Sequence, residues 1–195
     1  MTTAPSAAGR AAPGSPWLAP VLRAAPALIV GLTITFVADH SALVGMVMLG
    51  TFGLASAAVL AITGVRMGRG EPMRQLHRGL AIIAGIAGLL ALAVVATSAT
   101  AGLGMLVLLV GGYAVLAGGL ELVWGIRHRQ RSPLARDAIV IGVGTLALAV
   151  VLAFVGDPVS AVGFFGAYAV VLGVFLVIAG LSARWSSPAK ESPAS

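Results

Sequence analysis

Long stretches without a charged residue are the feature that most constrains how this chain can fold. These runs are residues 24–38, 41–65, 79–120, 138–156 and 158–183. A helix rises about 1.5 Å per residue, so about 20 apolar residues cross the hydrocarbon core of a bilayer. The run at 79–120 is long enough for two crossings and has one polar break, at Thr97, Ser98 and Thr100. The pattern therefore predicts an all-α integral membrane protein with six transmembrane helices.

Composition supports a membrane class over a soluble one. Apolar residues make up 59% of the 195 residues, and charged residues only 9%. A soluble domain of this length could not keep so much apolar surface away from water, whereas lipid tails solvate an apolar helix directly. The chain has no cysteine, which excludes disulfides, thiolate nucleophiles and thiolate metal ligands.

The arginines predict how the spans are oriented. The predicted spans are 21–38, 42–65, 78–97, 101–126, 138–156 and 159–183. With these spans, all twelve Arg and Lys residues fall on one side of the membrane. The positive-inside rule makes that side the cytoplasm and places both termini there. We expect disordered tails at 1–20 and 184–195.

The first predicted span is the shortest charge-free segment. Residues 24–38 cross the bilayer only if the helix begins near Val21 and the side chain of Arg23 extends to the interface. An uncleaved helix is preferred over a signal peptide here, because signal peptides place their apolar stretch closer to the start. All ten prolines are expected in tails, loops or first helical turns.

Internal repeats divide the predicted spans into three hairpins. The sequence LALAVV occurs at Leu90–Val95 and again at Leu146–Val151, and Tyr113–Gly118 resembles Tyr168–Gly173. Phe52 precedes Arg66 by the fourteen positions that separate Tyr113 from Arg127, which indicates a degenerate first copy. The hairpins are 21–65, 78–126 and 138–183. Each copy has two spans, so all three insert in the same orientation as parallel repeats.

Small residues four positions apart recur in the second helix of each hairpin. The pairs are Ala114 with Gly118, Ala169 with Gly173, and Gly53 with Ala57. Such pairs share a helix face and let two backbones approach closely in lipid. They predict helix packing within the chain, with homo-oligomerisation as the alternative.

Three polar residues inside the predicted spans are candidate functional residues. Glu121 is the one acidic residue within a span, and an intramembrane carboxylate is a candidate for proton or ligand handling. It lies about 9 Å from the cytoplasmic helix end, so snorkelling or pairing with an arginine is the structural alternative. Tyr113 and Tyr168 either line a cavity or bond a neighbouring helix backbone.

The outer connections contain three ionisable residues, Asp39, His40 and Asp157. Carboxylates and imidazoles take up protons as their surroundings acidify, so these residues either sense acid or simply hydrate short turns. The loop arginines either determine topology or bind anionic lipid or acidic partners, and no nucleic-acid binding is expected. No cofactor, metal site or catalytic residue set is expected, so the chain is interpreted as a non-enzyme.

Together, these features resemble a known family. Three tandem two-helix repeats, the GYAVLAGGLEL stretch at 112–122 and the arginine cluster Arg127–Arg131 are similar to the HdeD-like acid-resistance membrane proteins. The resemblance covers roughly residues 24–184. It implies a bacterial inner-membrane protein associated with acid or envelope stress. A small channel or transporter for protons or a small solute is the alternative function.

Overall fold

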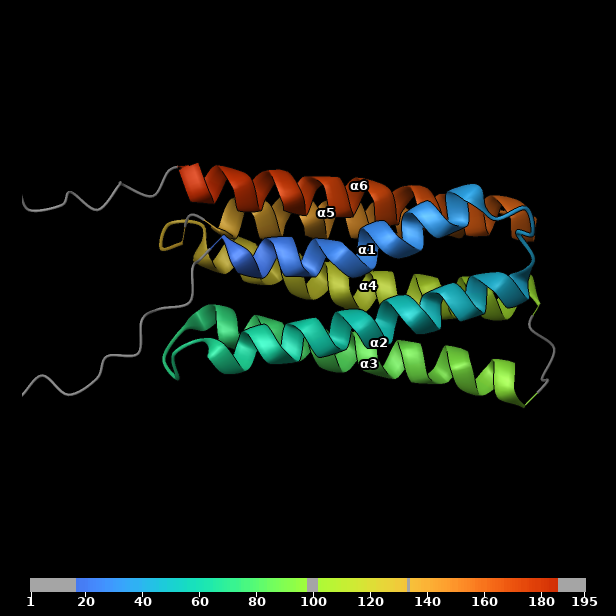
Figure 1. The fold of residues 1–195 in the computed structure, drawn as a ribbon, viewed down its shortest axis with the longest axis horizontal. Helices are drawn as coiled ribbons and strands as arrows, with labels where there is room; N and C mark the ends of the chain where they lie inside the picture. The colour runs from blue at the N-terminus through green and yellow to red at the C-terminus, as the bar shows by residue number, and fades with distance from the viewer. Residues whose placement is uncertain (1–16, 98–101, 133, 186–195) are drawn as a thin grey trace, which may run out of the picture.

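The computed structural model describes residues 17–97, 102–132 and 134–185, which form an all-helical bundle (Figure 1). The helices are α1 (Leu18–Phe36), α2 (Ala42–Arg66), α3 (Pro72–Ala96), α4 (Leu103–His128), α5 (Leu134–Leu152) and α6 (Pro158–Trp185). Each is long and apolar enough to cross a membrane. The predicted six-helix membrane fold is confirmed. The predicted turn at Ser98–Thr100 and most of both predicted tails lie outside the described residues.

Local sequence signals explain where several helices begin. The Ser41 hydroxyl accepts a hydrogen bond from the Val44 backbone N–H and caps α2. Helix α3 has Pro72 at its first position, where a backbone N–H would have no partner in the helix. The Asp157 carboxylate accepts a bond of 2.8 Å from the Ser160 N–H at the start of α6. These caps lie in or beside the short polar connections predicted from sequence.

Helix α1 differs from its prediction. It begins at Leu18, inside the segment expected to be disordered, and ends at Phe36. Pro26 consequently lies in the helix interior, where it is buried, so the expectation that no proline interrupts a helix was wrong. Proline removes the N–H that would bond the Leu22 carbonyl.

The six helices run alternately in opposite directions (Figure 1). The start of α1, the end of α6 and the α2–α3 and α4–α5 connections therefore lie at one end of the bundle. Most arginines in the part of the chain that the structure describes belong to these segments. We call this the arginine end. It corresponds to the face predicted to be cytoplasmic.

The helices pack as three close pairs: α2 with α3, α4 with α5, and α1 with α6. Glycines permit the close approach in each pair. A Cβ atom added at Gly53 would lie 2.5 Å from the Ala84 carbonyl, and one at Gly142 would lie 2.6 Å from the Leu122 nitrogen. In the third pair, a Cβ at Gly31 would lie 2.7 Å from the Val170 nitrogen. These are backbone atoms, which cannot rotate aside.

The close pairs are offset by one helix from the sequence hairpins. Helices within a repeat, such as α3 and α4, touch less than helices on either side of an arginine-bearing connection. Helices α2, α4 and α6 meet one another at the centre. Gly53, Gly118 and Gly173 each face a helix of the same chain, so their faces are already occupied. A homo-oligomer would need a different face.

The α2–α3 pairing predicts a disulfide between two engineered cysteines in this cysteine-free chain. A Cβ at Gly85 would lie 3.5 Å from the Ala57 Cβ, which is within the Cβ separation of disulfides. The double variant Ala57→Cys/Gly85→Cys should form an intramolecular disulfide on mild oxidation, detected by thiol labelling and intact mass.

Ala57→Cys/Gly111→Cys is the control, because no atom lies within 4 Å of a Cβ at Gly111. This variant should remain reduced. Cross-linked dimers of the first variant, with no intramolecular product, would contradict the pairing.

Candidate functional site

An ion pair lies inside the bundle, between Arg23 of α1 and Glu121 of α4. The Arg23 Nη2 donates a hydrogen bond to the Glu121 Oε1. The Glu121 side chain is 2% exposed and that of Arg23 is 17% exposed. Arg23 therefore points inward, and the expectation that it extends to the interface was wrong. Burying an unpaired carboxylate is so unfavourable that the nearest cation is drawn to it.

The ion pair joins two helices that are not neighbours. The backbones of α1 and α4 do not approach each other, because α1 packs on α6 and α4 packs on α5. The long Arg23 side chain bridges the gap between these two close pairs. It is the one salt bridge among residues 17–97, 102–132 and 134–185. The pair lies about 8–10 Å from the arginine end, as measured by helical rise.

Aromatic rings pack around the bundle centre beside the ion pair. Phe52 of α2 makes edge-to-face contacts with Tyr113 of α4, at 5.7 Å between ring centroids, and with Phe165 of α6, at 5.8 Å. All three rings are buried. Each central helix thus contributes one ring, and this arrangement fixes the distance between α2, α4 and α6.

A small cavity of about 10 Å³ adjoins the ion pair. Its lining includes Arg23, Ser56 and Tyr113 as polar side chains, and Leu172 on the α6 side. That volume corresponds to about one water molecule. The cavity is too small for an organic solute.

Tyr168 lies apart from this cavity and takes part in a hydrogen-bond chain with α5. The Thr145 hydroxyl donates to the Ile141 carbonyl at 2.7 Å, and its oxygen lies 2.8 Å from the Tyr168 hydroxyl. Because the Thr145 hydrogen is already used, Tyr168 is the donor in the second bond. The two candidate tyrosines therefore occupy different environments. Sequence alone could not show this, because the two residues occupy matching positions in the repeat.

The candidate residues of the outer connections lie in turns or cap helices. The Asp39 carboxylate accepts hydrogen bonds from the Ser41 N–H, at 2.8 Å, and from its hydroxyl, at 3.1 Å. Asp157 caps α6 through Ser160, and these hydrogen bonds lower the pKa of the Asp157 carboxyl below its ordinary value of 3.8. His40 is half-buried next to Asp39. The structure does not bring Asp157 together with Glu121.

Aromatic residues also order the arginine end. The Arg184 guanidinium lies 5.1 Å from the centre of the Trp17 ring, which joins the ends of α1 and α6. The Trp124 indole N–H donates to the Pro72 carbonyl at 3.2 Å, and its ring stacks on His128. Trp124 is buried, so it is a packing residue between α3 and α4 as well as an interfacial one.

No group of three or more His, Cys, Asp or Glu side chains that could hold a metal ion occurs in the part of the chain that the structure describes. Comparisons with known protein families, curated proteins and solved structures found no match. The fold and the buried ion pair define the class of the protein: a six-helix, multi-pass membrane protein with a charged pair inside the bundle.

Removing one partner of the ion pair should destabilise the protein strongly. Arg23→Met or Glu121→Met leaves the other charge buried and unpaired, which costs about 3–5 kcal/mol in free energy of unfolding. The double variant should be more stable than either single variant, because no charge is left alone. Equilibrium unfolding of all four proteins in detergent completes the double-mutant cycle. If the two single substitutions changed the free energy of unfolding additively in the double variant, the proposed coupling between Arg23 and Glu121 would be contradicted.

Asp157 should contribute to stability at neutral pH and lose that contribution only in strong acid. Its pKa is lowered in the folded protein, so its stabilisation is complete above the unfolded carboxyl pKa, near 4. It is lost as pH falls through the lower folded value. Asp157→Ala should lower the melting temperature in detergent equally at pH 7 and pH 5.5. A melting-temperature difference that disappears by pH 5.5 would contradict this prediction, because it would show that Asp157 titrates in mild acid.

Proposed function

We propose that this chain is a non-enzymatic protein of the bacterial inner membrane that supports survival of acid or envelope stress. In this proposal both termini lie in the cytoplasm, and the Arg23–Glu121 ion pair is the acid-responsive element. The observation that carries the proposal is the pair itself: a carboxylate, buried in the membrane domain, that links two separate helix pairs. The similarity of residues 112–122 and 127–131 to the HdeD-like proteins supports the physiological setting.

The ion pair supplies a physical route from acidity to structure. Protonation of Glu121 would remove the charge that compensates Arg23 and weaken the contact between α1 and α4. Arg23 would then be an unpaired cation among apolar side chains, which favours a rearrangement that brings it to water. Because α1 and α4 have no backbone contact of their own, this ion pair is the salt bridge that links them directly.

Survival after acid challenge tests this function. A deletion strain should survive acid less well than its parent, and the wild-type gene should restore survival. Glu121→Gln should fail to restore it, since the amide cannot titrate. The double variant Arg23→Met/Glu121→Met should also fail although it reaches the membrane in normal amounts, as judged by immunoblot.

Arg131→Gln, which removes an exposed arginine at the same end, is the matched control and should restore survival fully. Restoration by the double methionine variant would show that the pair has only a structural role. If deletion has no effect at any pH, the proposed acid function is excluded.

A second candidate function is proton conduction. The cavity of about 10 Å³ beside Arg23 and Tyr113 favours it, because a single bound water could connect Arg23, the partner of Glu121, to the hydroxyls of Ser56 and Tyr113. Proton flux into proteoliposomes, followed with an internal pH dye, should then be lost in Glu121→Gln. No flux under any imposed pH gradient or membrane potential would exclude conduction.

A further inference from the structure

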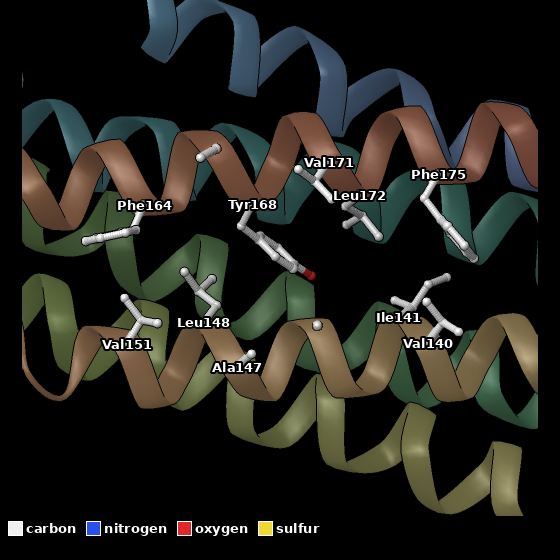
Figure 2. A pocket seen from close by; sticks show the side chains of 12 residues that line it. Val140, Ile141, Ala147, Leu148, Val151, Phe164, Tyr168, Val171, Leu172 and Phe175 are labelled. Atoms are coloured by element: carbon white, nitrogen blue, oxygen red, sulfur yellow. The ribbon is translucent and has the colours of Figure 1, made fainter.

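A groove between α5 and α6 opens on the side of the bundle (Figure 2). The two helices pack less tightly on each other than any other pair of consecutive helices. The groove extends from Val140 to Val151 on α5 and from Phe164 to Phe175 on α6, a length of about 16 Å along the helix axes. It is separate from the ion-pair cavity, although Leu172 lines both.

The shape of the groove suits a hydrocarbon chain better than a helix. Its volume is about 360 Å³. Spread over about 16 Å, this volume gives a mean cross-section of about 22 Å², whereas an α-helix at least 10 Å across needs about 80 Å². A helix of a second copy could therefore cover the groove but could not fill it.

The chemistry of the lining also favours hydrocarbon. No charged residue lines the groove, and its polar side chain is Tyr168, whose ring reaches toward α5 (Figure 2). The Tyr168 hydroxyl donates to Thr145, and Thr145 donates to the Ile141 carbonyl. Both hydroxyl hydrogens are therefore used within the protein. A ligand whose polar atoms only accept hydrogen bonds would find no free donor on these two side chains.

A cation lies one helical turn beyond the groove. Arg136 precedes Val140 by four residues, so it shares that face of α5, about 6 Å nearer the arginine end. Arg136 is exposed. A guanidinium at this position can bind a phosphate through two hydrogen bonds. An acyl chain in the groove would then be continuous with a headgroup at Arg136.

We infer that the α5–α6 groove binds one acyl chain of an anionic phospholipid whose phosphate pairs with Arg136. The groove selects for a flexible chain by its cross-section, and Arg136 selects for the negative headgroup. Lipid tails surround all apolar faces of a membrane protein, so retention of one particular lipid must come from these two features together. The site does not depend on the proposed acid function.

Native mass spectrometry of the purified full-length protein tests this inference. The protein is released from detergent micelles after incubation with phosphatidylglycerol or phosphatidylcholine carrying identical 16- and 18-carbon chains. Wild-type protein should retain one phosphatidylglycerol per chain, with at least threefold higher occupancy than phosphatidylcholine. Equal occupancy by the two lipids would overturn the headgroup assignment.

Two matched pairs of variants separate the groove from the headgroup site. Gly144→Leu fills the groove and should lower the occupancy of both lipids at least fivefold, whereas Gly111→Leu on α4 should not. A Cβ at either glycine meets no atom within 4 Å, so both variants should fold. Ala147→Leu, at another exposed groove position, repeats the test if the melting temperature of Gly144→Leu is reduced.

Arg136→Gln should remove the preference for phosphatidylglycerol, whereas Arg131→Gln, at another exposed arginine, should preserve it. Wild-type occupancy in both groove variants would overturn the inference. So would an unchanged lipid preference in Arg136→Gln.

Discussion

Close contact between helix backbones is the interaction on which the rest of this structure depends. Helices in lipid gain little from hiding apolar side chains, because the lipid tails are equally apolar. Dispersion contacts must supply the attraction, and they are strongest where no side chain separates the backbones. Gly53, Gly142 and Gly31 provide such places in the three close pairs. The aromatic centre and the ion pair lie between these close pairs and connect them.

The glycine contacts and the ion pair have different roles in the bundle. Glycine contacts hold each pair together along its length, whereas the Arg23–Glu121 pair acts at a single level of the bundle. A glycine contact does not change with pH. The ion pair does, because it exists only while Glu121 is charged. Acid would therefore act on the ion pair between the helix pairs and not on the glycine contacts within them.

Much of the fold could be predicted from the sequence, because the bilayer imposes simple rules on length and charge. The six spans and the clustering of arginines at one end followed from charge-free runs. The start of α1 could not be predicted in the same way. The predicted span began near Val21, whereas α1 begins at Leu18, before Pro20. The sequence around Arg23 also did not indicate that its side chain pairs with Glu121 of α4.

The candidate site was predictable in part. Glu121 could be identified because a carboxylate is rare inside a span, but its partner lies 98 residues away in sequence. The small-residue pairs predicted close packing but not the identity of the partner helices, since Gly53 or Gly173 would suit any small-faced neighbour. The repeat suggested that Tyr113 and Tyr168 are equivalent, and their neighbours made them different. Thr145 completes the hydrogen-bond chain of Tyr168, and no sequence signal marked it.

The pairing of α1 with α6 has a consequence for how the protein is made. Helix α1 leaves the ribosome before α6, on which it packs, and Arg23 emerges 98 residues before Glu121. At about 5–20 residues per second, the arginine waits about 5–20 s for its counter-ion. During that interval α1 carries an unpaired cation and has none of its glycine contacts with α6. Helix α1 therefore reaches its final contacts only after α6 has been made.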